Sequence, residues 1–225
     1  MTTSIIECIS LSKYYSGRNQ IIRAVDNINL QINMKEFILI KGRSGAGKST
    51  LINLMCGLDR PTSGDVIVEN EYINRMSNQG LSKLLLKKIG IIFQNFNLLP
   101  TYTVYENIEI ALEPAVNDFG KNKRIIHTLL EKLELEDKMN SLPSELSMGQ
   151  QQKVAIARTL AKQPSIIFAD EPTGSVDEET AKEIIRHLLK LKNEQDVTLI
   201  MASHGNSLDK YADKIVIVQN GKILD

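Results

Sequence analysis

The sequence predicts an α/β fold built on a mostly parallel sheet, with an antiparallel β subdomain and an inserted helical subdomain. Three observations support this prediction. Short apolar runs that are typical of buried strands alternate with stretches of helical periodicity. A glycine-rich segment at residues 42–49 separates one such strand from one such helix. Strands that alternate with helices favour parallel pairing, whereas hairpins near the two ends of the chain favour antiparallel pairing.

The expected strands follow from apolar runs and from period-two alternation. A turn is expected at 16–19, between the first two strands, and Asn220-Gly221 is typical of a two-residue hairpin turn. In chain order, the expected strands are 4–10, 21–32, 37–40, 65–69, 89–93, 165–169, 197–201, 214–218 and 223–224.

The expected helices follow from apolar residues at helical spacing. Ser147 and Gln150 have the spacing of a capping box, which predicts that a helix begins there. The other expected helices are 50–56, 81–88, 104–112, 121–135 and 178–192, where the charge run 121–124 is interpreted as a solvated helix start. Residues 1–94 and 163–225 are therefore expected to form the core with the antiparallel subdomain, and about 95–162 the helical subdomain, all within one domain.

Composition restricts the classes of protein to consider. The chain has 225 residues, with 27 Lys and Arg against 27 Asp and Glu, so its charge balance indicates no nucleic-acid partner. Two cysteines, Cys8 and Cys56, make no disulfide framework, and Cys56 is expected to be a small buried hydrophobe. No signal peptide and no run of about 20 apolar residues is found. We expect a cytosolic protein whose membrane role, if any, comes through a partner.

Residues 42–49 fit the pattern G-x-x-x-x-G-K-[ST] without a mismatch. The expected order of strand, glycine loop and helix is the one that a phosphate-binding loop requires. Glycines allow the backbone N–H groups to turn inward, and the helix adds the positive end of its dipole. Lys48 would supply a positive charge to the β- and γ-phosphates, and the Ser49 hydroxyl is a suitable ligand for Mg²⁺.

Polar residues stand at the ends of two further expected strands. Asp170 and Glu171 follow the apolar run 165–169, and His204 lies just beyond the strand at 197–201. Ligands of open parallel sheets bind at the carboxyl ends of the strands, which favours a site here. The pair Tyr14 and Tyr15 is open to two interpretations, packing at a strand end or stacking of one ring on adenine.

These motifs, together with Gln94 and the segment 146–150, stand in an order that resembles the ATP-binding-cassette ATPases. The resemblance runs from about residue 4 to the end of the chain. Three segments, 56–64, 93–100 and 170–177, are most similar to ATPase subunits of the macrolide-exporter, lipoprotein-release and antimicrobial-peptide transporter type. The resemblance implies a P-loop NTPase core with a RecA-like sheet.

The resemblance also implies a role for each matching residue. Gln94, Glu171 and His204 would be catalytic: Gln94 would sense the γ-phosphate, Glu171 would polarise the attacking water and His204 would contact the γ-phosphate. Ser49, Gln94 and Asp170 would serve the Mg²⁺ site. Ser147, Gly149, Gln150 and Asp177 would reach the nucleotide held by a second copy of the chain. ATP itself would be bound by Tyr15, which would stack on adenine, and by Gly42, Arg43, Ser44, Gly45, Ala46, Gly47, Lys48, Ser49 and Thr50.

The sequence departs from the family's usual pattern in three ways. Met148 replaces the first glycine of Leu-Ser-Gly-Gly-Gln, which adds a side chain where backbone approaches phosphate. Gly205 follows His204 where Asp is common, and Ser175-Val176 replaces a small residue followed by Leu. These departures concern the tightness of dimer closure and the rate of ATP turnover. They do not affect the resemblance to the ATP-binding-cassette ATPases.

The function implied by the resemblance is that of an ATPase subunit. It would form a homodimer on ATP and power a separate membrane permease, on the inner face of the cell membrane, for a peptide, a drug or a lipophilic substrate. The surface around residues 95–107 would dock the permease. An alternative is an ATP-driven mechanical or signalling switch that acts on a membrane partner without transport. A DNA-repair or translation cassette would need a long coiled-coil insertion or a second cassette, and we expect neither.

Overall fold

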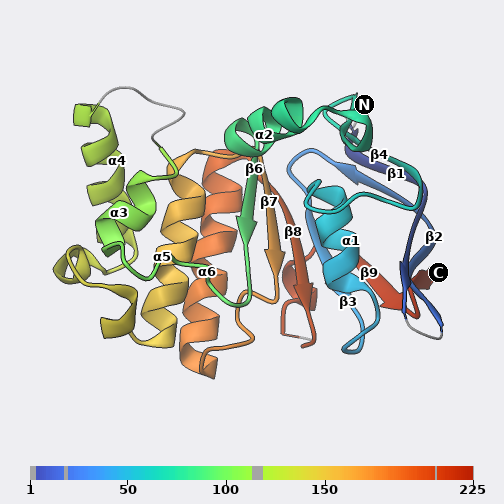
Figure 1. The fold of residues 1–225 in the computed structure, drawn as a ribbon. Helices are drawn as coiled ribbons and strands as arrows, with labels where there is room; N and C mark the ends of the chain where they lie inside the picture. Colours follow the sequence, from blue (N-terminus) through green and yellow to red (C-terminus); the bar gives the residue numbers. More distant parts are fainter. Residues whose placement is uncertain (1–3, 18–19, 113–118, 206, 225) are drawn as a thin grey trace. The chain divides into compact units, whose positions relative to one another are not determined.

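The structure is a computed structural model that describes residues 4–17, 20–112, 119–205 and 207–224 (Figure 1). The predicted turn at 16–19 therefore lies partly outside the described residues. The chain divides into two compact units: residues 1–83 with 196–225, and residues 84–195. The predicted helical subdomain, about 95–162, falls within the second unit.

The first unit contains an antiparallel sheet in the order β2-β1-β4-β5. Its strands are β1 (Ser4–Ser16), β2 (Ile21–Asn33), β4 (Ser63–Val68) and β5 (Glu71–Tyr72). β1 pairs with both β2 and β4. The apolar residues that predicted these strands, such as Ile6, Leu11, Val25 and Ile28, are buried, as expected for a sheet with one face on the core. The predicted antiparallel subdomain is confirmed.

The same unit contains a set of mainly parallel strands in the order β10-β9-β3-β8. These are β3 (Phe37–Lys41), β8 (Thr198–Ser203), β9 (Lys214–Gln219) and β10 (Lys222–Leu224). β3 is parallel to β8 and β9, and Lys41 stands opposite Ser203. Because parallel strands end at the same edge, the segments that follow β3 and β8 are neighbours.

The helices of the first unit follow the strands closely. α1 (Lys48–Met55) comes directly after the glycine loop, and α2 (Asn78–Lys87) begins in this unit and continues into the second. Two short 3-10 helices, Ile73–Arg75 and Asp209–Tyr211, complete it. The Asn-Gly hairpin between β9 and β10 is confirmed: Asn220 and Gly221 have φ values of 50° and 76°, as a type I′ turn requires.

Besides the end of α2, the second unit contains two parallel strands and four helices among its described residues. The strands are β6 (Ile89–Ile92) and β7 (Ile166–Asp170), and the helices are α3 (Val104–Glu109), α4 (Phe119–Lys132), α5 (Met148–Ala161) and α6 (Glu178–Gln195). Short 3-10 helices lie at Glu136–Lys138 and Pro143–Glu145. α3, α4 and α5 share one apolar core, which includes Val104, Ile108, Ile126, Leu130 and Val154.

The lengths of β1 and α3 differ from the predictions for identifiable physical reasons. β1 continues to Ser16, well past the expected end at residue 10. The predicted strand ended too early because register shifts after Cys8 and after Leu11 interrupt the alternation of buried and exposed residues. α3 ends at Glu109 rather than at residue 112, where the chain tightens into a turn in which the N–H of Ala111 donates to the carbonyl of Ile108.

Both cysteines are buried thiols, as the sequence predicts for Cys56. Burial raises the pKa of the Cys8 thiol to about 12, so this group stays protonated at neutral pH. Within the described ranges, no helix has both the length and the apolar character needed to cross a lipid bilayer.

Asn107 fastens the segment before α3, although the sequence analysis did not single it out. Its side chain is fully buried. Its Oδ1 accepts a hydrogen bond from the N–H of Leu99 at 2.8 Å, and its Nδ2 lies 2.9 Å from the carbonyl of Tyr102 and 3.0 Å from that of Thr103. Thr103 in turn caps α3 through a capping box with Glu106. One amide thus replaces the regular backbone pairing that residues 99–103 lack.

We predict that Asn107→Ala lowers the free energy of unfolding by about 2–4 kcal/mol, because buried backbone groups lose their partners and a small cavity opens. Urea denaturation followed by circular dichroism measures this change. The control is Asn140→Ala at an exposed position, for which we expect a change within about 0.5 kcal/mol. Equal stability of the two variants would contradict the role of Asn107.

Candidate functional site

The glycine loop of the first unit connects β3 to α1, and its shape depends on two missing side chains. A Cβ atom on Gly42 would lie 2.2 Å from the carbonyl oxygen of Val218, and a Cβ atom on Gly47 would lie 2.1 Å from that of Ala24. Gly47 also has a φ of 106°, in the left-handed region that favours glycine. The motif's glycines are therefore required by the close approach of backbone, as a phosphate-binding loop requires.

The loop encloses the side chain of Lys48. Only 4% of this residue is exposed, and its Nζ donates to the carbonyl oxygens of Gly42 at 3.0 Å and Arg43 at 3.3 Å. Gly47, the N-cap of α1, has no side chain that could cap the helix. The positive end of the α1 dipole and the ammonium group are thus combined at one loop, which suits a bound phosphate.

The structure places His204 beside this loop. The residue follows β8, and its Nδ1 lies 3.1 Å from the carbonyl oxygen of Gly42. The contact follows from the parallel pairing of β3 with β8, which brings Lys41 opposite Ser203. The expectation that the end of the strand 197–201 lies at the proposed site therefore agrees with the geometry of the first unit.

The two tyrosines of β1 have different partners. The Tyr14 hydroxyl donates to Asp26 Oδ1 at 2.8 Å, whereas the Tyr15 hydroxyl donates to Asp59 Oδ2 at 2.7 Å. Asp59 lies in the loop that follows α1, and Tyr15 is 40% exposed. Asp59 was not among the predicted site residues. Its only signal in the sequence was its position in the segment 56–64.

In the second unit, the structure brings Gln94 next to the acidic pair. β6 and β7 are parallel, with Ile92 opposite Ala169, so Gln94, just after β6, and Asp170, the last residue of β7, lie at neighbouring strand ends. A Cβ atom on Gly174 would lie 2.9 Å from Gln94 Nε2, which shows how closely the amide lies against the turn after Glu171. This is the strand edge at which open parallel sheets bind ligands.

Glu171 has an unusual backbone conformation. Its φ is 47°, in the left-handed region, and its carbonyl accepts a hydrogen bond from the N–H of Gly174 at 3.0 Å. Non-glycine residues adopt this conformation at a cost, and such positions are concentrated at functional sites. The turn thus fixes the position of the glutamate at the end of β7.

The N-terminus of α5 is the predicted capping box. Ser147 Oγ accepts a hydrogen bond from the N–H of Gln150 at 3.2 Å, and Gln150 Oε1 accepts one from the N–H of Ser147 at 2.9 Å. Ser147 is exposed, and so is Met148, at 58%. The helix tip therefore presents a polar, preordered surface to its surroundings.

Asp177 lies at the N-terminus of the neighbouring helix α6. Its carboxylate accepts hydrogen bonds from the N–H of Thr180 at 3.0 Å and from the Thr180 hydroxyl at 2.6 Å, and these two bonds hold its pKa below the usual range. Lys153 of α5 and Glu183 of α6 form an ion pair at 2.7 Å. The ends of α5 and α6 that carry Ser147 and Asp177 are thus held together.

Comparison with known proteins agrees with this geometry. The family model described as "ABC transporter" matches residues 25–174, which is more than half of the chain. This chain belongs to the ABC transporter family. As an ABC ATPase, it binds ATP, and its α/β P-loop fold is that of an ATP-binding cassette.

Individual relatives cover nearly the whole ABC cassette. The ABC transporter ATP-binding protein MJ0796 of Methanocaldococcus jannaschii is 39% identical over 97% of this chain and 95% of its own length. The lipoprotein-releasing system ATP-binding protein LolD of Buchnera aphidicola is 37% identical over 98% of this chain and 96% of its own. A solved dimeric structure of MJ0796, in a post-hydrolysis state bound to ADP and Pi, matches with a TM-score of 0.93 and 36% identity over 98% of this chain and 97% of that one.

In the segment 146–150, the geometry explains why methionine is tolerated at position 148 and why glycine is needed at position 149. A Cβ atom on Gly149 would lie 2.6 Å from Thr180 Cγ2, so a larger residue would collide with α6. Met148 is exposed, and its side chain has room outside the helix pair. The departure at Met148 therefore changes the surface of the helix tip without disturbing the packing beneath it.

We predict that Gly149→Ala lowers the free energy of unfolding of the cassette by about 1–2 kcal/mol through overpacking against Thr180. Adding Thr180→Ser should restore most of the loss, because serine lacks the colliding methyl group but keeps the hydroxyl that bonds Asp177. Urea denaturation of the two single variants and the double variant measures the rescue. Purely additive effects would show that the collision is not the cause.

Proposed function

We propose that the cassette is the ATP-hydrolysing subunit of a transporter, which dimerises on ATP and powers a separate membrane permease. The observation that carries this proposal is the phosphate loop, in which the Lys48 ammonium is enclosed and the His204 ring lies 3.1 Å from the carbonyl of Gly42. Phosphoryl transfer needs positioning and charge stabilisation, and this loop offers both. We locate the protein on the inner face of the cell membrane, through its permease.

Each matching residue would have its own role toward ATP. Tyr15 would stack on adenine, and the loop from Gly42 to Thr50 would hold the phosphates through its N–H groups, with Lys48 neutralising the β- and γ-phosphates. Gln94 and His204 would position the γ-phosphate and the attacking water. Glu171 would accept the proton of that water, a role supported by its fixed position in the turn after β7.

The donor set fits a Mg²⁺ ion held largely by the nucleotide. The Ser49 hydroxyl, the Gln94 amide oxygen and the Asp170 carboxylate are hard oxygen ligands, which Mg²⁺ prefers. Within the described part of the chain, no group of three or more His, Cys, Asp or Glu residues could hold a metal ion. A Mg²⁺ ion bound by Ser49, Gln94 and Asp170 would have its remaining coordination positions filled by phosphate oxygens and water. When bound, Mg²⁺ would neutralise developing charge on the phosphates.

The exposed tip of α5 supports the proposed homodimer. Ser147, Gly149 and Gln150 form a capped helix N-terminus, and Asp177 stands at the start of the adjoining helix. A second copy, arranged head to tail, would offer its nucleotide to this tip, because helix N-termini bind phosphates. MJ0796 is dimeric in its solved structures, which supports a homodimer for this chain.

The segment after Gln94 is the proposed permease contact. Its backbone is held in place from α5: the Arg158 guanidinium donates to the carbonyls of Phe96 at 2.8 Å and Asn97 at 2.7 Å, and Asn107 fixes the residues that follow. Tyr102 is 40% exposed on this segment. A partner bound here would be connected to α5 and its exposed tip.

We further propose that the substrate is a peptide, a drug or a lipophilic molecule, which is exported or extracted. The relative LolD belongs to a lipoprotein-releasing system, which is consistent with the lipophilic class.

We predict that Glu171→Gln slows ATP hydrolysis at least about 100-fold, because the general base is lost, while ATP affinity changes less than about 3-fold. Steady-state phosphate release and ATP titration measure the two effects. Glu179→Gln, at an exposed position of α6, is the matched control and should keep full turnover. Retained turnover in Glu171→Gln would reject Glu171 as the base.

A further inference from the structure

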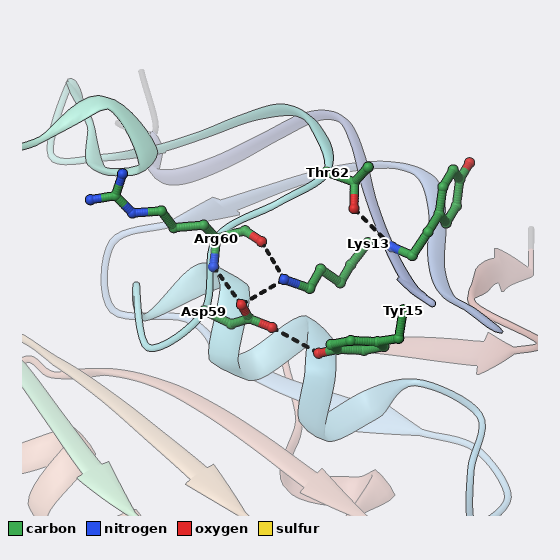
Figure 2. Close-up of polar contacts among 6 residues, drawn as sticks. Lys13, Tyr15, Asp59, Arg60 and Thr62 are labelled. Atoms are coloured by element: carbon green, nitrogen blue, oxygen red, sulfur yellow. Dashed lines mark hydrogen bonds and ion pairs between the residues drawn. The ribbon is translucent and has the colours of Figure 1, made fainter. Parts of the chain in front are cut away.

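The Tyr15 side chain is fixed by a polar network that the proposed mechanism does not use. Figure 2 shows its hydroxyl pointing to Asp59, which lies on the loop after α1, and the two groups are 2.7 Å apart. The residue is 40% exposed, so the ring is held at its hydroxyl end while part of its surface stays open. This arrangement leaves room for a stacked base.

Asp59 is itself held rigidly. The Lys13 ammonium donates to Asp59 Oδ1 at 2.6 Å and to the carbonyl of Arg60 at 2.7 Å, and the N–H of Arg60 donates to Asp59 Oδ1 at 2.7 Å (Figure 2). Burial raises the pKa of Asp59, but the hydrogen bonds from Lys13, Tyr15 and Arg60 outweigh it and hold that pKa below the usual range. The carboxylate is therefore ionised at neutral pH and accepts these bonds as a charged group.

The loop that carries Asp59 is also tied to β1 by the backbone. The N–H of Thr62 donates to the carbonyl of Ser12 at 2.8 Å, and the Thr62 hydroxyl accepts from the N–H of Tyr14 at 3.0 Å. A Cβ atom on Gly64 would lie 2.3 Å from the carbonyl oxygen of Ser10, so glycine is needed for this close approach. The segment 59–64, a motif without an assigned role, thus fastens the end of α1 to β1.

A further contact restricts the ring itself. The Lys13 ammonium lies 5.0 Å from the centre of the Tyr15 ring, within the range of a cation–π interaction. Burial and the hydrogen bond to Asp59 raise the pKa of Tyr15. Asp59 is in turn joined to α1, because its N–H donates to the carbonyl of Asn53 at 3.1 Å.

We infer that Asp59, held by Lys13, is a positioning residue that presets the Tyr15 ring for stacking on the adenine base. A preset ring loses little rotamer freedom on binding, which improves affinity for the base. The inference rests on the proposed function, because it assumes that Tyr15 stacks on adenine. It predicts that Asp59 affects the binding of the base and leaves the binding of the phosphates unchanged.

The test compares Mg-ADP, which has the base, with Mg-pyrophosphate, which lacks it. Tyr15→Phe keeps the ring but removes the hydroxyl, and Asp59→Ala removes its acceptor. We expect each variant to weaken ADP binding about 3- to 10-fold, the size expected for one hydrogen bond. Pyrophosphate affinity should stay unchanged. Isothermal titration calorimetry measures the dissociation constants.

The double variant Tyr15→Phe/Asp59→Ala provides the sharper result. Both changes remove the same hydrogen bond. The ADP affinity of the double variant should therefore equal, within about 2-fold, that of the single variant with the lower ADP affinity. The control is Asp65→Ala, which removes another carboxylate of the same unit, one that is paired with Arg75 at 2.6 Å. This control should leave both affinities unchanged.

Tyr15→Ala separates this inference from the proposed function, since it removes the ring and should weaken ADP binding at least about 10-fold. If Tyr15→Ala binds ADP normally, stacking itself is wrong and the inference fails with it. If Tyr15→Ala weakens binding but Tyr15→Phe and Asp59→Ala do not, only the role of Asp59 is overturned. A loss of pyrophosphate affinity in Asp59→Ala would also overturn it. Should Asp59→Ala fail to fold, Tyr15→Phe still decides, because it leaves Asp59 and Lys13 in place.

Discussion

The phosphate loop depends on backbone contacts that leave no space for side chains. Gly42 lies against the carbonyl of Val218, and Gly47 against that of Ala24. The hairpin turn joins the same group: the N–H of Gly221 donates to the carbonyl of Ala46 at 2.9 Å, and the N–H of Asp26 donates to the carbonyl of Gly221 at 2.8 Å. Loop, hairpin turn and β2 therefore support one another directly, and the shape of the loop follows from the whole first unit.

Polar side chains fix several loops and helix ends that regular backbone pairing does not hold. Asp59 holds the end of α1 to β1, Asn107 and Arg158 hold the segment after Gln94, and Ser147 completes its own helix end. Each of these groups fixes a loop that carries a proposed contact with the base, with the permease or with the second copy. Preordered loops lose less conformational entropy when they bind a ligand, so these side-chain contacts should strengthen the proposed binding.

The features that sequence analysis could predict are those encoded locally. The glycine loop, the capping box at Ser147 and the Asn220-Gly221 turn each lie within a few residues, and each is present in the structure. The end of β1 could not be predicted, because its register shifts interrupt the alternation on which the prediction depends. Asp59 was missed because its partner Lys13 is 46 residues away, and a single sequence does not reveal such a pair. The roles of the catalytic residues came from the resemblance and stay predictions.

The central claim is that two copies of the chain close on ATP, each offering its α5 tip to the nucleotide of the other. Sedimentation velocity of Glu171→Gln over a range of protein concentrations tests for this dimer. We expect monomers with Mg-ADP and a concentration-dependent dimer with Mg-ATP. A variant that stays monomeric at saturating Mg-ATP and at the highest protein concentration would contradict it.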